Sequence, residues 1–203
     1  MMDKNLYDLF RLQEEENQGE NKKSESNLIE KILKTRNILL SGEINKSLAE
    51  RIIRQLILLE DQGEEPVKVF IDSPGGDADA GFAIFDMMRF VKPEVIIIGM
   101  GLVASAAAII LLAAPKERRI ALPNSHYLIH QPLSGMRGVA TEIEIHAKEL
   151  DKLRRKINKL ISEETGQKLE KVEKDTDRDY WMNADEALEY GLISKIISNR
   201  DEL

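Results

Sequence analysis

Strand-like and helix-like segments alternate through the middle of this chain, and that alternation most limits how it can fold. Segments 67–72 and 95–98 are short apolar runs, rich in β-branched residues, that read as buried strands. Segments 80–90 and 104–114 follow them and have the composition of helices. Strands and helices in this order form βαβ units, in which helices cover both faces of a parallel sheet. The sequence therefore predicts an α/β fold.

Further elements are expected on both sides of this region, and the pattern changes after Pro115. A long helix is expected over 141–164, where Ile143, Leu150 and Ile157 recur every seven residues. This seam fits either packing within the chain or self-association through a protruding arm. The preceding segment, 133–139, could form the edge of a strand. Further strands are predicted at 38–40, 118–121, 126–129 and 195–197, with helices at 48–59, capped by Asn45, and at 184–191.

Residues 1–27 differ from the rest: 1–12 could form an amphipathic turn through Leu6, Leu9 and Phe10, and 13–27 are polar and lack a regular apolar period. They read as a mobile tail or as a segment that orders on assembly. The chain has 203 residues and a net charge of −7, which argues against a nucleic-acid partner. It has no cysteine, so disulfides and thiol chemistry are excluded. We expect a cytoplasmic protein, because no signal peptide or membrane span is recognisable.

Ser105 is the first candidate for chemistry. It follows an apolar strand and opens a helix of small residues, at the edge where parallel sheets bind ligands. Backbone N–H groups at the start of a helix could stabilise an anion formed there. The alternative is a serine that only caps the helix. The turn Pro74-Gly-Gly76 could present further N–H groups to a ligand, or could simply end a strand.

Three histidines are candidates for a general base. His130 ends a predicted strand and is best placed to serve a site at strand ends, whereas His146 lies among charged residues of the long helix. His126 is four strand residues from His130, roughly 13 Å away, so the two cannot share a metal ion. No metal site is predicted. The run 175–179 offers three aspartates as the acid, and spacing alone does not choose among them.

Several motifs resemble those of one family. Over about 28–197 the chain is similar to ClpP, the proteolytic subunit of the Clp protease, in both the order and the spacing of its motifs. The matching stretches are IDSPGG at 71–76, ASA at 104–106, ALPNS at 121–125, IHQP at 129–132, ATEIEIHA at 140–147 and DTDRD at 175–179. The resemblance implies a ClpP/crotonase-like fold of repeated β-β-α units. It also implies a domain over 28–203, after a divergent N-terminal axial segment at 1–27, and a strand-plus-long-helix handle at about 133–164.

The resemblance also assigns roles to residues. It implies a serine endopeptidase that cleaves unfolded proteins, with Ser105 as nucleophile, His130 as base and Asp179 as acid. The remaining roles it implies are an oxyanion hole at Gly76 and Ala106, a ring-to-ring sensor at Gln131, Asp177 and Arg178, and an ATPase-docking pocket at Lys68, Phe70 and Phe90. The chain itself would need no cofactor, because ATP is used by a partner unfoldase.

The implied assembly is a chamber of two seven-membered rings, fed by an AAA+ unfoldase of the ClpX, ClpA or ClpC type. The sequence departs from the family at Ala107, where a glycine is usual, and at Lys68, where an aromatic residue is usual. These departures favour a divergent paralogue that works in a mixed complex with a second ClpP subunit. Two alternatives remain: a weakly active or inactive structural partner in such a mixed ring, and a crotonase-like acyl-CoA enzyme.

Overall fold

The computed structural model describes residues 31–203, so the expectation for residues 1–27 lies outside the described part. The chain divides into two units after Asn37, and residues 38–203 form the second. The strands are β1 (Asn37–Ser41), β2 (Val67–Ser73), β3 (Val95–Ala104), β4 (Arg119–Ala121), β5 (His126–Ile129), β6 (Tyr180–Asn183) and β7 (Lys195–Ile196). The helices are α2 (Lys46–Gln62), α3 (Ala78–Phe90), α4 (Ala106–Leu111), α5 (Ala140–Thr165), α6 (Leu169–Asp175) and α7 (Ala184–Tyr190).

The strands form one sheet whose order is β1-β2-β3-β4-β7. Strand β3 has two halves: Ile97–Gly99 pairs with β4, and Leu102–Ala104 pairs in parallel with β5. Between the halves Gly101 has a φ of 55°, and the Asp72 carboxylate accepts a hydrogen bond of 3.0 Å from the Leu102 N–H. This bend lets one strand serve two neighbours, so that the ends of β3 and β5 lie side by side.

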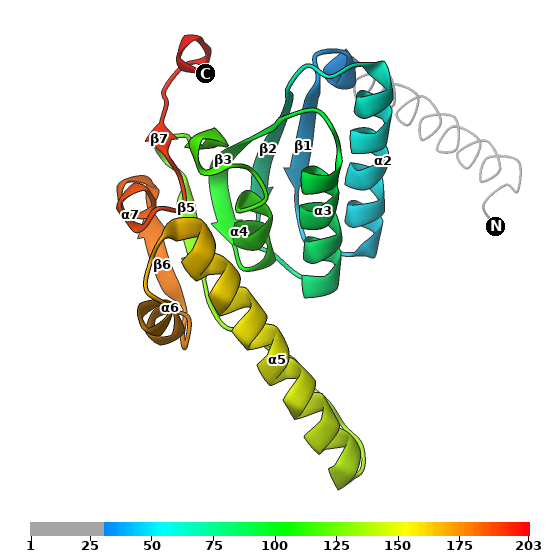
Figure 1. Ribbon diagram of the computed structural model, residues 1–203, viewed down its shortest axis with the longest axis vertical. Helices are drawn as coiled ribbons and strands as arrows, with labels where there is room; N and C mark the ends of the chain where they lie inside the picture. Colours follow the sequence, from blue (N-terminus) through cyan, green and yellow to red (C-terminus); the bar gives the residue numbers. More distant parts are fainter. Residues whose placement is uncertain (1–30) are drawn as a thin grey trace, which may run out of the picture. The chain divides into compact units, whose positions relative to one another are not determined.

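Helices α2, α3 and α4 cover one face of the sheet (Figure 1). Alternate residues of β2, including Val67, Val69 and Ile71, are fully buried, and each contributes roughly 1.5–3 kcal/mol through removal from water. Lys68 and Phe70 lie on the opposite face and are only half-buried. We expected helices on both faces of the sheet, but at β2 only one face is fully covered.

Helix α5 extends well beyond the sheet (Figure 1). Ile157 and Ile161, near its C-terminal end, are buried, whereas Ile143 and Ile145 are 45% and 58% exposed. Pairs such as Lys148 with Glu144, 2.7 Å apart at i,i+4, support the exposed part of the helix. The apolar seam was expected either to pack within the chain or to lie on a protruding arm. The N-terminal part of the helix is such an arm.

The α/β fold with its parallel sheet is confirmed, and most predicted elements lie where expected. Helix α4 begins at Ala106 instead of residue 104, because β3 continues through Ala104. Segment 133–139 is not a strand in this single chain, since no strand of the described residues pairs with it. Helix α6 and strand β6 were not predicted. Within 31–203, no helix is both long enough and apolar enough to cross a membrane.

Candidate active site

Ser105 occupies the sharp turn between β3 and α4. Its φ of 56° and ψ of −119° are rare for a residue with a side chain, and such backbone strain costs roughly 1–3 kcal/mol. The turn is fixed by neighbouring strands, because the Ser105 N–H donates to the Leu128 carbonyl at 2.9 Å. The Ser105 hydroxyl makes no hydrogen bond that caps α4. The strain thus serves to aim the hydroxyl elsewhere, and the capping alternative does not describe this serine.

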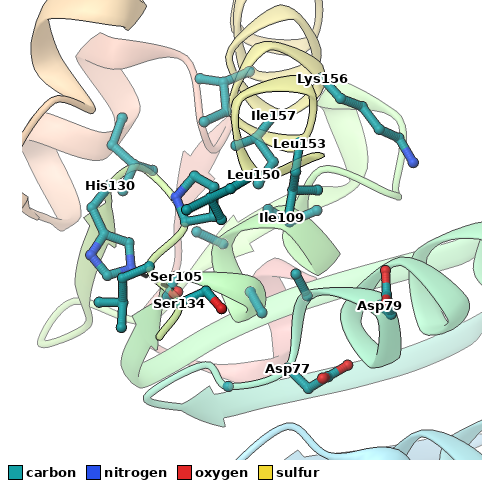
Figure 2. Close-up of a pocket in the computed structure, with 18 of the residues that line it drawn as sticks. Asp77, Asp79, Ser105, Ile109, His130, Ser134, Leu150, Leu153, Lys156 and Ile157 are labelled. Carbon is teal, nitrogen blue, oxygen red and sulfur yellow. Dashed lines mark hydrogen bonds between the residues drawn. The ribbon is translucent and has the colours of Figure 1, made fainter. Parts of the chain in front are cut away.

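His130 follows β5 and lies beside Ser105. Its Nε2 is 2.8 Å from Ser105 Oγ, and its Nδ1 is 3.0 Å from Asp179 Oδ1 (Figure 2 shows the first pair). The His130 side chain is 18% exposed and that of Asp179 is 61% exposed. A carboxylate at Nδ1 fixes the ring tautomer so that Nε2 can accept a proton from the hydroxyl. The three side chains therefore form a chain from acid to base to hydroxyl.

The other two histidines lie outside the hydrogen-bonded group of Ser105, His130 and Asp179. His126 begins β5, where it pairs with Asn183 of β6 and is exposed. His146 of α5 lies 3.0 Å, through its Nε2, from the Ser134 hydroxyl oxygen. Over the described residues 31–203, no group of three or more His, Cys, Asp or Glu side chains could hold a metal ion.

The glycine turn lies directly against Ser105. A Cβ on Gly75, whose φ is 91°, would come within 2.6 Å of both the Ser105 Cβ and the Ala104 carbonyl oxygen. Gly76 has a φ of 144°, and a Cβ there would collide with the carbonyl oxygen of Ile44. Backbone bonds from Ile44 N to Gly75 O and from Asp77 N to Ile44 O, 2.7 and 2.8 Å long, hold the turn in place. Only glycine fits at these two positions.

The structure chooses among the three aspartates of 175–179. Asp175 accepts from Lys171 at 2.6 Å and from the Tyr190 hydroxyl at 2.9 Å, on the side of α6 that faces α7. Burial raises the pKa of Tyr190 well above its usual value, and the hydrogen bond to Asp175 raises it further. Asp177 is exposed, and Asp179 alone of the three contacts His130.

The three residues implied as a ring sensor lie next in sequence, or nearly so, to His130 and Asp179. The Gln131 backbone N–H donates to the Thr176 carbonyl, and its side-chain amide donates to the Asp177 carbonyl, both at 2.6 Å. Asp177 and Arg178 are exposed and form no ion pair with any side chain of the described chain. Sequence reasoning missed Thr176, and with it Asn158 of α5, whose side-chain oxygen contacts the Thr176 hydroxyl. Nothing in the spacing of these two residues indicates that they meet.

A cleft of about 810 Å³ opens beside Ser105. Gly76, Ala106 and His130 line it around the hydroxyl, and apolar side chains such as Leu150 and Leu153 of α5 line the opposite wall (Figure 2). A hydroxyl paired with an imidazole, at the edge of a cleft with an apolar wall, suits acyl transfer.

The residues expected to dock an ATPase are spread over two elements. Phe70 of β2 packs against a cluster of Ile98, Ile120 and Ile197 on the less covered face of the sheet, where Lys68 also lies. Phe90 ends α3, and its side chain is 77% exposed.

The chain was compared with known proteins. Residues 19–200 match the model of the Clp protease family. The chain is 66% identical over 190 residues to the ATP-dependent Clp protease proteolytic subunit 2 of Treponema denticola, which covers 91% of this chain and 95% of that protein. It is 47% identical over 182 residues to subunit 3 of Rhizobium etli, covering 90% of this chain and 92% of the relative.

A solved structure agrees with the sequence matches. A ClpP1 mutant from Listeria monocytogenes superposes with a TM-score of 0.81 and is 49% identical in sequence. The match covers 86% of this chain and 98% of that one. At 49% identity the likeness is one of sequence as well as of fold.

Proposed function

This chain belongs to the Clp protease family, and on that premise we propose that it is a serine endopeptidase whose catalytic triad is Ser105, His130 and Asp179. Membership supports a proteolytic subunit that hydrolyses peptide bonds. The observation that carries the serine mechanism is the continuous contact from Asp179 to His130 to Ser105, at 3.0 and 2.8 Å. The spacing suits proton transfer along the chain of side chains.

In the proposed reaction His130 Nε2 takes the proton of the Ser105 hydroxyl while the oxygen attacks the carbonyl carbon of the peptide bond. The carbonyl oxygen becomes an anion, held by the backbone N–H groups of Gly76 and Ala106. The C–N bond then breaks, and His130 returns its proton to the departing amine. Water, deprotonated by His130, then attacks the acyl carbon, the bond from that carbon to Ser105 Oγ breaks, and His130 returns the proton to Oγ as the acid is released. Asp179 keeps the imidazole oriented and stabilises its positive charge.

No cofactor takes part in these steps. The partner in the proposed assembly is an unfoldase that uses ATP to feed unfolded protein into a closed chamber, and we propose the cytoplasm as the place where both act. The surface that we propose for docking consists of Phe70, which is half-buried against the core cluster of Ile98, Ile120 and Ile197, of Lys68 on the same face of β2, and of the exposed Phe90 at the end of α3. The chamber would consist of two rings of seven, containing this chain alone or together with a second ClpP subunit.

Ring pairing is proposed to act through Asp177 and Arg178. Both side chains are exposed, and neither has an ionic partner within the described residues, so they are available to a facing subunit. Arg178→Ala is expected to reduce the assembly size measured by light scattering. An unchanged size would contradict the sensor role of this pair.

Two other functions make different predictions. A structural ring partner with an idle triad would assemble with a paralogue but would not react at Ser105. A crotonase-like enzyme would bind CoA thioesters tightly and would not need the serine. The aligned side chains from Asp179 to Ser105 favour the protease over both.

The deciding experiment is intact-mass analysis after treatment with a serine-directed fluorophosphonate. Wild type and Ser105→Ala are compared, each alone and mixed with a paralogous ClpP subunit. An adduct that depends on Ser105 in either condition supports the protease, and its appearance only in the mixture indicates activation by the partner. The absence of an adduct in both conditions would overturn the proposed mechanism.

A further inference from the structure

The segment 42–44, which directly follows β1, holds the peptide group that joins Gly75 to Gly76. The Ile44 N–H donates to the Gly75 carbonyl at 2.7 Å, and the Ile44 carbonyl accepts from the Asp77 N–H at 2.8 Å. The Ile44 side chain is fully buried, so its backbone is anchored in the core. The turn that begins with Gly75 is therefore bonded to a fixed part of the fold.

The bond to the Gly75 carbonyl decides which way the Gly76 N–H points. In a trans peptide group the C=O and the N–H lie on opposite sides, and none of the peptide bonds in the described part of the chain is cis. Because the Gly75 carbonyl points at Ile44, the Gly76 N–H points away from Ile44. That N–H makes no hydrogen bond with any described residue. Gly76 lines the cleft together with Ser105 and Ala106, so the unused donor is available to a ligand there.

A buried serine holds the preceding peptide group of the same turn. Ser73 ends β2 and is fully buried, and its hydroxyl oxygen accepts a hydrogen bond of 3.1 Å from the Gly75 N–H. This is a serine turn, in which the side chain bonds to the backbone two residues later. Two consecutive peptide groups are thus each held by one hydrogen bond, the first by Ser73 and the second by Ile44.

We propose that the Ile44 backbone N–H and the Ser73 hydroxyl are positioning groups that hold the Gly76 N–H ready to receive the oxyanion. This inference rests on the proposed function. Glycine has no side chain to limit backbone rotation, so without these bonds the peptide group could turn its N–H away from the cleft. A donor that is fixed in advance stabilises the developing charge without reorganisation. A carbonyl that accepts a hydrogen bond also polarises its peptide group, which strengthens the N–H as a donor.

The two positioning groups act apart from the acid and the base. Among the described residues, neither Ile44 nor Ser73 forms a hydrogen bond with His130 or Asp179, and neither lines the cleft. Loss of either group should therefore weaken the oxyanion hole while leaving proton transfer by His130 as it is. This separation gives the inference a signature of its own.

The direct test replaces Ile44 by the corresponding α-hydroxy acid, which keeps the side chain but puts an ester oxygen in place of the N–H. Replacing Gly42 by glycolic acid is the matched control. The Gly42 N–H donates to the Asp72 carbonyl at 3.1 Å, so the control loses a backbone bond of the same segment. The lost bond does not involve the peptide group that carries the Gly76 N–H.

Ser73→Ala tests the second positioning group by ordinary mutagenesis. Ser125→Ala is its control, because Ser125 is also buried and its hydroxyl donates to the Leu122 carbonyl at 2.7 Å. Ser125 precedes β5, whereas His130 follows it, so the control removes a buried hydroxyl at the other end of that strand.

The readouts are kcat and KM for an unstructured peptide, the inhibition constant of a peptide aldehyde, the pH dependence of kcat/KM, and the melting temperature. An aldehyde that reacts with Ser105 forms a hemiacetal whose oxygen takes the place of the oxyanion, so its affinity reports the oxyanion hole. All measurements use the full chain, alone or with the paralogous subunit if wild type needs it.

The Ile44 ester is expected to lower kcat by roughly 10- to 100-fold, somewhat less than the loss of an oxyanion donor itself. KM should stay unchanged, and the aldehyde should bind more weakly by a similar factor. Ser73→Ala should act in the same direction. The Gly42 ester and Ser125→Ala should lower the melting temperature without lowering kcat. The pH at which kcat/KM rises should stay that of wild type, because it reports the base.

Wild-type kcat and aldehyde affinity in the folded ester and in Ser73→Ala would overturn the inference. If the ester does not fold, Ser73→Ala decides by itself. A shifted pH profile would place the effect at His130 and would also contradict the inference, as would an equal loss of kcat in the two controls. Failure of wild type to hydrolyse peptide or to be labelled at Ser105 would instead overturn the proposed function, and this inference with it.

Discussion

Ser105 Oγ lies 2.8 Å from His130 Nε2, although 25 residues separate the two in the chain. The contact follows from the parallel pairing of β3 with β5, in which Ala104 lies opposite Leu128. Ser105 directly follows Ala104, and His130 comes two residues after Leu128, so both side chains lie at the same edge of the sheet. The backbone of Ser105, at a φ of 56°, then turns its hydroxyl toward the imidazole.

Replacing Ser105 separates its chemistry from its strain. Ser105→Ala should abolish peptide hydrolysis and leave the melting temperature nearly unchanged, because alanine keeps the Cβ and the strained φ. Ser105→Gly should be equally inactive but more stable than Ser105→Ala by about 1 kcal/mol, since glycine adopts positive φ without the steric cost. Thermal unfolding and a peptide assay check both. Hydrolysis by either variant would contradict the assignment of the nucleophile.

Asp179→Asn should lower kcat by at least roughly 100-fold, with little change in KM. The amide keeps the shape of the side chain but favours the wrong histidine tautomer, which is the main cost of such a change. Asp185→Asn, at an exposed position in the first turn of α7, is the matched control and should retain full activity. Equal kcat values for the two variants would exclude Asp179 as the orienting acid.

Gly76→Ala should lose activity and be destabilised by at least about 1–3 kcal/mol. The new Cβ would meet the Ile44 carbonyl oxygen, so the turn that presents the Gly76 N–H must move. Gly135→Ala provides the comparison, because no heavy atom lies within 4 Å of its Cβ position. Chemical denaturation and kcat measure both effects. A fully active Gly76→Ala would show that this N–H does not need its present position.

Arg119 makes Glu164 important for stability. The guanidinium is buried, donates to the Ala114 and Glu164 carbonyls at 2.8 and 2.9 Å, and forms an ion pair with the Glu164 carboxylate. Burial lowers the pKa of Arg119, and Glu164 opposes that effect. Glu164→Gln leaves the buried charge without its counter-ion and should cost about 3 kcal/mol of unfolding free energy.

The neighbouring residue supplies the control for this prediction. Glu163 is exposed and pairs loosely with Lys159 at 3.6 Å, so Glu163→Gln should change the free energy by less than about 0.5 kcal/mol. Both values come from denaturant titration at constant pH. Similar losses of unfolding free energy in the two variants would mean that the buried ion pair stabilises the fold no more than the exposed one.

Tyr127 should make the fold sensitive to alkali. Burial raises the pKa of Tyr127 to about 12, above the usual value of about 10. Because the folded-state pKa is the higher one, its contribution is fully present below about pH 10 and is lost as the pH rises through about 12, by about 3 kcal/mol in all. Tyr127→Phe should lose this part of the alkaline decline, as measured by denaturation at several pH values. An identical decline in the variant would exclude Tyr127 as its source.

Much of this molecule could be predicted from local sequence. The β-branched run at 67–72, the glycines that end it and the small residues after Ser105 have the periods and compositions of their elements, so the α/β class and the edge that carries the site were predictable. The motifs around Gly76, Ser105 and His130 also indicated the family. These features depend on neighbours within a few residues, which a sequence displays directly.

Other features depended on contacts between distant segments. Three aspartates in 175–179 have the same local chemistry. The pairing of Tyr180 with Ile129, together with the hydrogen bonds from Gln131 to residues 176 and 177, brings Asp179 to His130. Segment 133–139 could not be assigned from its residues, because a strand exists only where another strand pairs with it. The sequence by itself determined which side chains could do chemistry. The tertiary structure decided which of them meet, because hydrogen bonds between distant backbone segments fix those distances.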